Sequence, residues 1–576
     1  MRLDFSHVEI DASDGDALSV SAFESSDWPT GSRWQWSVVN AGDDPVTVGS
    51  ISLVFRLFDP AGPVRMFRNG YQSWGDSGVV TLGVDEDLSR VPQALDVPLI
   101  RAAYNADQTI SPPGELRSEL VTALTDGFAP VLLLGFDGGD RHDGTLRLRP
   151  GEDPELRAEA FLGGAVLAPG EERELHGVVT TTGDDATPLL EGWAQEVGRR
   201  NQARVAAPYQ VGWCSWYHYF HDLTEADVRS NLALAADWPF DVFQIDDAYQ
   251  SAIGDWLTTN ERFPSTLDQL SAAIAAEGRT PGLWIAPFIA APDSRVATDH
   301  PDWLARQVEG DGYLPGMFNP PWGGGMGGVM WALDTTHPEV QAHLEDLGRS
   351  LREAGYPYLK LDFTYAPSFE GRWHDPSKTP AQRVRLGYDA VRRGAGDDAF
   401  LLGCGAPLGP VIGVVDGNRI GPDVDPRWEV DPTRDDLGIM AGYVGSLPAT
   451  KHGWRNTLAR SFMHRTLWLN DPDCLMLRTD KTEMTPAMVE AWAHAVAVSG
   501  GMALVSDDLS LLGSDCRRLL DEVVAIGRQA DAEALRGLPA RCPDLMDHPV
   551  PHRLEAAGYH LDGDPDAGTA TLTPPA

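Results

Sequence analysis

The chain has 576 residues, of which 42% are hydrophobic, and its formal net charge is −40. That length is too great for a single domain, and the apolar content is sufficient for large cores. The acidic balance argues against nucleic acid and against an anionic membrane surface as partners, because both attract lysine and arginine.

The N-terminal stretch MRLDFSHVEIDASDGD has no apolar core, so we predict no signal peptide. No apolar run reaches the length of a transmembrane helix. The five cysteines are scattered without Cys-x-x-Cys spacing, which favours neither a disulfide framework nor a zinc knuckle. We therefore expect a cytoplasmic protein. Only four of the 45 basic residues are lysines, a composition that fits a GC-rich genome but leaves adaptation to high salt open.

Residues 1–195 are predicted to form a β-sandwich of the supersandwich type. Short alternating apolar runs such as RWQWSVVN, VTVGSISLVFRLF and VLLLGF are bounded there by Gly, Asp and Pro. A helical stretch at 189–202 leads out of this region.

From about residue 208 short apolar runs alternate with helical stretches such as 225–238 and 338–355. We predict eight strands, within residues 209–217, 240–247, 282–288, 358–363, 400–407, 416–424, 466–473 and 502–508. Eight β/α repeats over about 300 residues match the size of a TIM barrel. We therefore predict a (β/α)8 barrel over 196–510. Residues 511–576 are expected to contain a helix and then a small β segment or a poorly ordered tail.

The fourth predicted strand, YPYLKLDF, contains one of the few lysines. Lys360 and Asp362 share a strand face because alternate residues point the same way, and the leucines between them point to the helices. The pair is then expected to face the barrel axis near the strand's C-terminal end, where barrel enzymes have their active sites. The alternative is a structural ion pair, but a buried pair contributes little net stability.

Asp246 and Asp247 end the second predicted strand, and two adjacent acids suit either a metal ion or sugar hydroxyls. We favour hydroxyls, since no convincing histidine or third carboxylate joins them locally. His218 and His221 are close in sequence but are expected to pack or to form hydrogen bonds.

The sixth strand ends with Arg419, Asp423 and Asp425, for which the alternative is an Asp-Pro turn.

Aromatic residues lie at several of these strand ends, namely Trp213, Trp216, Tyr217 and Trp284. For each tryptophan alone, core packing is the ordinary explanation. Together with carboxylates at a barrel mouth, however, they favour a carbohydrate ligand. Carboxylates accept hydrogen bonds from neighbouring hydroxyls, and aromatic faces stack on the C–H surface of a pyranose.

Seven motifs occur in the order found in one known family: NGYQSWG (69–75), GWCSWY (212–217), IDD (245–247), LKLDF (359–363), GCGAPLGP (403–410), RIGPD (419–423) and WLNDPDCL (468–475). In them the chain resembles the retaining α-galactosidases, or melibiases, of glycoside hydrolase family 36. The resemblance implies Asp362 as nucleophile and Asp423 as acid/base. It implies substrate-binding positions at Trp74, Tyr217, Asp246, Asp247, Trp284, Lys360, Cys404 and Arg419.

The resemblance implies hydrolysis of terminal α-galactosyl residues by double displacement, with no metal or organic cofactor. Asp425 lies two residues beyond Asp423 and is the alternative acid/base. α-N-acetylgalactosaminidase activity, galactosyl transfer and a non-catalytic carbohydrate-binding protein are the alternative functions. A small carbohydrate is the expected partner, and the sequence leaves the oligomeric state undetermined.

Overall fold

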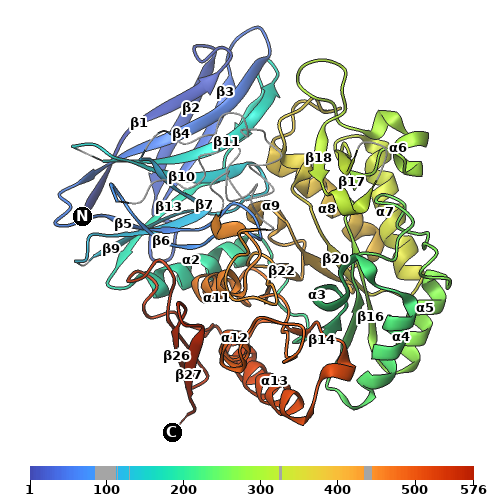
Figure 1. The fold of residues 1–576 in the computed structure, drawn as a ribbon. Coiled ribbons are helices and arrows are strands. Elements are labelled where there is room, and N and C mark those ends of the chain that lie inside the picture. Colours follow the sequence, from blue (N-terminus) through green and yellow to red (C-terminus); the bar gives the residue numbers. More distant parts are fainter. Residues whose placement is uncertain are drawn as a thin grey trace.

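The computed structural model describes residues 1–84, 112, 114–128, 130–152, 154–323, 327–433 and 444–575. Figure 1 shows an N-terminal β region in blue to cyan, a barrel in green to orange, and a small red sheet near the C-terminus. The predicted fold class, a β-sandwich followed by a TIM barrel, is confirmed. The predicted domain bounds at 195 and 510 stay predictions.

The N-terminal region consists of two antiparallel sheets. The first has the order β1 (Arg2–Ala12), β4 (Val46–Phe58), β11 (Glu155–Leu167), β10 (Asp143–Arg149), β7 (Leu116–Glu119). The second has the order β12 (Glu172–Glu174), β3 (Gly31–Asn40), β13 (Val178–Gly183), β9 (Val131–Phe136), β8 (Val121–Thr125), β5 (Arg65–Arg68), β6 (Gly78–Thr81), and β2 (Leu18–Ser25) pairs with β3. Apolar residues of both sheets, among them Leu53 and Leu134, form one core.

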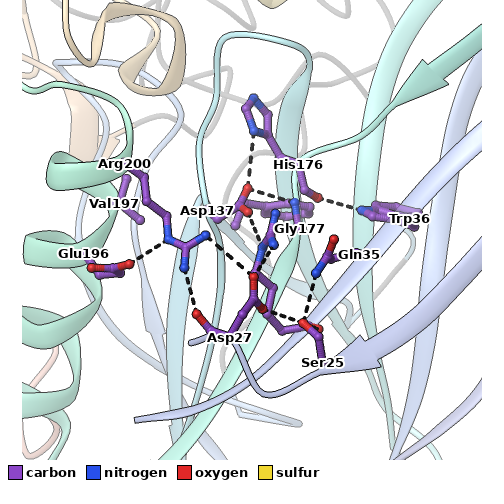
Figure 2. Close-up of polar contacts among 12 residues, drawn as sticks. Ser25, Asp27, Gln35, Trp36, Asp137, His176, Gly177, Glu196, Val197 and Arg200 are labelled. Atoms are coloured by element: carbon purple, nitrogen blue, oxygen red, sulfur yellow. Dashed lines mark hydrogen bonds and ion pairs between the residues drawn. The ribbon is translucent and has the colours of Figure 1, made fainter. Parts of the chain in front are cut away.

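Helix α2 (Ala186–Arg200) connects the sandwich to the barrel and is held by charged groups, several of which are drawn in Figure 2. Arg200 bonds Glu196 through Nε at 2.7 Å and donates from Nη2 to the carbonyl oxygen of Asp27 at 2.9 Å. Arg33 joins the carboxylates of Asp27, at 2.8 Å, and Asp137, at 2.6 Å. The Arg200–Asp27 hydrogen bond ties the end of the helix to the sandwich, and Arg33 fixes Asp27 within the sandwich.

The barrel is an eight-stranded parallel sheet. Its order is β23 (Leu469–Asp471), β22 (Gly417–Arg419), β21 (Phe400–Gly403), β20 (Tyr358–Leu361), β16 (Thr280–Ile285), β15 (Val242–Ile245), β14 (Val211–Cys214), β24 (Ala503–Val505). The seam between β23 and β24 is bridged by a 2.9 Å hydrogen bond from the Met502 amide to the Asn470 carbonyl. Seven of these strands lie within the predicted ranges, and β16 overlaps the predicted range 282–288 but begins two residues before it.

Several of the barrel helices begin at residues that cap them. They are α3 (Trp216–Tyr219), α4 (Glu225–Leu234), α5 (Leu267–Ala276), α6 (Arg295–Asp299), α7 (Pro338–Glu353), α8 (Pro380–Ala395), α9 (Leu408–Val411), α11 (Thr450–Ala459), α12 (Pro486–Ser499) and α13 (Ser514–Ala534). Thr224 and Thr379 each form a capping box, and Pro380 occupies the first position of α8. Such caps satisfy amide groups that have no partner within the helix.

A small antiparallel sheet between β16 and α7 was not predicted. It has the order β17 (Ile289–Ala290), β19 (Val329–Ala332), β18 (Pro315–Phe318), and a 3-10 turn, η5 (Pro320–Trp322), follows β18. These strands are too short to show a clear alternation, so they give almost no sequence signal. The insertion carries Trp322.

The predicted C-terminal β segment is a three-stranded antiparallel sheet of β25 (Arg553–Ala556), β26 (Tyr559–Asp564) and β27 (Thr569–Thr573). It packs on α12, and Trp428 donates from Nε1 to the Pro565 carbonyl at 2.7 Å. Within the described ranges, no helix is both long enough and apolar enough to cross a lipid bilayer.

Candidate active site

Lys360 lies between two buried carboxylates at the C-terminal end of the barrel strands. Its Nζ is 3.0 Å from Asp246 Oδ2 on the β15 side and 3.9 Å from Asp362 Oδ2, just beyond β20. Burial alone would lower the pKa of Lys360, but the carboxylates, Asp246 first, raise it well above its ordinary value. The ammonium ion is therefore a fixed positive charge shared by the two acids.

Asp362 is 6% exposed and has hydrogen bonds to both oxygens. Trp284 donates from Nε1 to Oδ2 at 2.9 Å, and the Phe363 amide donates to Oδ1 at 2.8 Å. Burial raises the pKa of this carboxyl, Lys360 opposes the rise, and the negative charge of Asp423 adds to it. Burial therefore has the largest effect on the pKa of Asp362, and Lys360 lies closer to Asp246 than to Asp362.

The second member of the Asp pair, Asp247, accepts hydrogen bonds from two side chains and lies close to a histidine. Gln250 Nε2 lies 2.5 Å from Oδ1, and Trp322 Nε1 lies 2.6 Å from Oδ2. His221 Nδ1 is 3.3 Å from the same Oδ2. Sequence reasoning missed Gln250 and Trp322, since their approach depends on loops, whereas His221 makes the kind of polar contact expected of it.

Arg419, at the end of β22, binds three carboxylates. Its Nε is 3.0 Å from Asp471 Oδ2, and its Nη1 is 3.0 Å from Asp423 Oδ1 and 2.8 Å from Asp473 Oδ2. Burial alone would lower the pKa of Arg419, but Asp471 and Asp473 raise it well above the ordinary value. The motif WLNDPDCL contains both acids, so it held a signal that the sequence analysis did not use.

Tyr217 is connected to the Arg419 cluster through Asp473. The Tyr217 hydroxyl donates a short hydrogen bond to Asp473 Oδ2, and the Val424 amide donates to the same oxygen at 2.9 Å. Burial raises the pKa of both Tyr217 and Asp473. The phenol therefore remains protonated and serves as a donor that orients Asp473.

The structure separates Asp423 from Asp425. The Asp423 side chain is 37% exposed and binds Arg419, which belongs to the cluster at the barrel mouth. Asp425 lies 3.3 Å from Arg427 Nη1, and that arginine also contacts Glu483 at 2.9 Å. Asp423 is thus the acid that shares a cation with the other candidate residues.

Aromatic residues and one thiol line the rest of the site. Trp74, on a sandwich loop, contacts Phe363 with ring centroids 5.3 Å apart, and its buried Nε1 has no hydrogen-bond partner among the described residues. Trp322 contacts Phe363 at 5.2 Å and Trp284 at 6.2 Å. Cys404 is buried, which raises the pKa of its thiol well above the ordinary value, and the charge of Asp362 acts on it in the same direction. The structure therefore brings all ten predicted residues to one end of the barrel.

Left-handed backbone conformations cluster beside these acids. The non-glycine residues Ala248, Phe363 and Asp473 have φ of 111°, 52° and 88°, and the first two directly follow Asp247 and Asp362. Such conformations cost about 1–3 kcal/mol each and persist where tertiary contacts enforce them. The strained backbone is consistent with tertiary contacts that hold the side chains of Asp247, Asp362 and Asp473 in fixed orientations.

Asp544, His548 and His552 are the only group of metal-ligating side chains found among the described residues, with ligand atoms within 4.8 Å of one another. This group lies between α13 and β25, outside the cluster at the barrel mouth. The Asp544 carboxylate already accepts the amides of His552 at 3.0 Å and Arg553 at 3.2 Å.

A family model described as melibiase matches residues 206–366, which contain β14 to β20. The α-galactosidase AgaA of Geobacillus stearothermophilus is 26% identical over 150 residues, or 24% of this chain and 20% of that protein. An A type blood alpha-D-galactosamine galactosaminidase of Flavonifractor plautii is 23% identical over 211 residues, or 34% of this chain and 19% of that protein. The aligned stretch thus spans about a fifth of the length of these curated relatives.

Solved structures match nearly the whole chain. TtGalA, an α-galactosidase from Thermus thermophilus in complex with p-nitrophenyl α-D-galactopyranoside, has a TM-score of 0.70 and 26% identity, covering 95% of this chain and 96% of that chain. The same protein has been solved in complex with stachyose. The crystal structure of the family 36 α-galactosidase AgaA has a TM-score of 0.60 at 15% identity, covering 92% and 74% of the two chains, and supports the fold alone. The resemblance to family 36 α-galactosidases that the motifs indicate is confirmed.

Proposed function

We propose that this protein is a retaining α-galactosidase that releases terminal non-reducing α-D-galactosyl residues from galacto-oligosaccharides. The observation that supports this most is the pair of unlike carboxylates at the barrel mouth. Asp362 is buried, fixed by Trp284 and close to an ammonium ion, whereas Asp423 is partly exposed and held by Arg419. A nucleophile and an acid/base need these two different environments.

In the first step Asp362 attacks the anomeric carbon while Asp423 donates a proton to the glycosidic oxygen. The bond to the leaving alcohol breaks and a covalent glycosyl-aspartate forms. In the second step Asp423, now a carboxylate, takes a proton from water, whose oxygen attacks the anomeric carbon and releases Asp362. Two inversions leave the α configuration unchanged.

The remaining polar residues bind and orient the sugar. Asp246 and Asp247 accept hydrogen bonds from galactose hydroxyls on the C4 and C6 side, and Lys360 and Arg419 donate to hydroxyls near Asp362. Trp74 closes the subsite from the sandwich, and its Nε1, which no described residue binds, is available to an oxygen of the bound sugar. TtGalA, which this chain resembles over its length, binds both an aryl α-galactoside and stachyose, and both carry terminal α-galactose.

Azide rescue tests the two catalytic assignments separately. Asp362→Ala should abolish hydrolysis of every substrate, and azide entering on the vacated side should give β-galactosyl azide. Asp423→Ala should still react with an aryl galactoside that has a good leaving group, and azide should then give α-galactosyl azide. Asp425→Ala is the matched control and should remain close to wild type. Opposite azide anomers would reverse the assignments, and acid/base behaviour in Asp425→Ala would transfer the role to that residue.

α-N-acetylgalactosaminidase activity is the second candidate, because one relative is named for α-D-galactosamine, a sugar that also carries a nitrogen substituent at C2. That activity needs space beside C2 of the sugar, where we place the small side chain of Cys404. A panel of p-nitrophenyl α-glycosides with purified protein distinguishes the candidates. Release from the α-galactoside supports the first, and release from the α-GalNAc member alone supports the second. No release from any member would favour a carbohydrate-binding protein without catalytic activity.

A further inference from the structure

Two buried side chains at the C-terminal end of α11, Asn456 and Arg460, contact both the sandwich and the barrel. They are four residues apart, so they lie on the same face of the helix. On one side they bind the sandwich loop 69–77, which carries Trp74. On the other side they bind the barrel segment 419–423, which carries Arg419 and Asp423.

Arg460 is 0% exposed, and each hydrogen bond from its guanidinium to a described residue ends on a carbonyl oxygen. Within the sandwich loop the acceptors are Asn69 Oδ1 at 3.0 Å and the main-chain oxygens of Gly70 at 3.0 Å, Ser73 at 2.9 Å and Gln72 at 3.4 Å. In the barrel segment the acceptor is the Ile420 oxygen at 2.9 Å. One side chain therefore holds five groups from two domains.

Asn456 repeats this pattern one helical turn earlier. Its Nδ2 donates to the Gly75 oxygen at 2.5 Å and to the same Ile420 oxygen at 2.9 Å. Its Oδ1 accepts the Ser77 amide at 3.2 Å. The carbonyl of Ile420 is thus the common point at which the two side chains join the barrel segment to the sandwich loop.

The burial of this guanidinium carries an energetic cost, which its neutral carbonyl acceptors and the negative charge of Asp76 offset. Burial, with a contribution from Arg455, lowers the pKa of Arg460 to about 9, so it remains charged at neutral pH. A buried cation is tolerated only when its donors are satisfied, and each carbonyl that it binds would lose a donor if the side chain changed. The donors of Arg460 and their carbonyl acceptors are therefore all paired only when loop 69–77 and barrel segment 419–423 both occupy their observed positions.

We propose that Arg460 and Asn456 are positioning residues that fix Trp74 and Asp423 relative to one another across the boundary between sandwich and barrel. This inference rests on the proposed function, because Trp74 is assigned to the sugar subsite and Asp423 to proton transfer. Trp74 follows Ser73 directly, and Asp423 lies three residues beyond Ile420. A shift of either segment would change the distance between the Trp74 indole and the Asp423 carboxyl group.

Hydrogen–deuterium exchange tests the coupling without reference to activity. Arg460→Gln removes the charge and most donors, and exchange should become faster in peptides covering both 69–77 and 419–425. Arg392→Gln is the matched control. Arg392 is also buried and donates to carbonyl oxygens, of Val414 at 2.8 Å and Ala399 at 2.6 Å, but these precede the barrel strands β22 and β21. Unchanged exchange in either peptide of folded Arg460→Gln would overturn the coupling. Asn456→Ala provides the same test if Arg460→Gln fails to fold.

Kinetics on an aryl α-galactoside then separates the effect that acts through Trp74 from the effect that acts through Asp423. Misplacement of catalytic groups by about 1 Å costs roughly 100-fold, and we expect a loss of that order in kcat/KM for Arg460→Gln. The effect on KM should disappear in a Trp74→Ala background, whereas the effect on kcat should persist because it acts through Asp423. Full additivity of the KM effects would overturn the inference. Absence of wild-type turnover would instead overturn the proposed function, and the exchange result would still stand.

Discussion

Replacement of Lys360 by methionine tests how the charge of the proposed nucleophile is maintained. The methionine keeps the length of the side chain but removes the ammonium that lies 3.9 Å from Asp362 Oδ2. Burial already raises the pKa of Asp362, and Lys360 is the first group that opposes this effect. Without the ammonium, the acid should become protonated at a higher pH and lose its nucleophilic form near neutrality.

The size of the effect follows from the distance. Two unit charges about 4 Å apart attract by about 4 kcal/mol at an effective dielectric constant of about 20, which is an upper estimate here. Since about 1.4 kcal/mol corresponds to one pKa unit, loss of the ammonium should raise the pKa of Asp362 by about one to three units, and kcat/KM should fall by roughly 10- to 1000-fold at pH values below the wild-type acidic limb. The acidic limb of the pH profile should move upward by about one to three pH units, and activity should partly recover at alkaline pH.

The assay is the pH dependence of kcat/KM on an aryl α-galactoside, with circular dichroism to verify folding. The matched control is Lys378→Met, which removes a lysine whose partner, Asp375 at 3.4 Å, belongs to a half-exposed pair. That variant should retain the wild-type acidic limb. An acidic limb that does not move in folded Lys360→Met, or that moves equally in both variants, would refute the role assigned to Lys360.

Three further predictions concern the sugar site, pH and salt. Asp247→Ala should reduce turnover at least about 100-fold, because it removes an acceptor for the sugar hydroxyls. The thermal unfolding temperature should stay near wild type, since the change does not remove core packing. Near-normal kinetics would exclude Asp247 from the sugar site. Burial alone would lower the pKa of His176, but the carboxylates of Asp137 and Asp140 raise it overall. Its stabilising effect should be complete below about pH 6.5 and lost as pH rises through the higher folded-state pKa. Wild type should thus lose more of its melting temperature above pH 6.5 than His176→Gln does, and parallel curves would contradict this. The net charge of −40 predicts self-repulsion that ions screen, so the melting temperature should rise from low to molar NaCl, and a flat curve would leave genome composition as the explanation.

Local sequence patterns determined the barrel and much of the site before any tertiary contact was known. All eight barrel strands were predicted because each is a short apolar run and several are followed by a helical stretch, and both periods are local properties of the chain. The two-residue period of a strand placed Lys360 and Asp362 on one face, and their ion-pair distance agrees with that placement. Because parallel strands of a closed barrel end at one rim, acids at different strand ends had to meet.

Only the tertiary structure decided which partner each acid has. The two-residue period allows Asp423 and Asp425 to share a face, yet one binds Arg419 and the other binds Arg427. Trp322 reaches Asp247 from an inserted sheet whose strands are too short to carry a sequence signal. Arg460 donates to carbonyls almost 400 residues away in the chain, about 390 for Gly70. Such contacts depend on how the sandwich, the barrel and the long loops pack together, and no periodicity along the sequence encodes the distance between two side chains that the fold brings together.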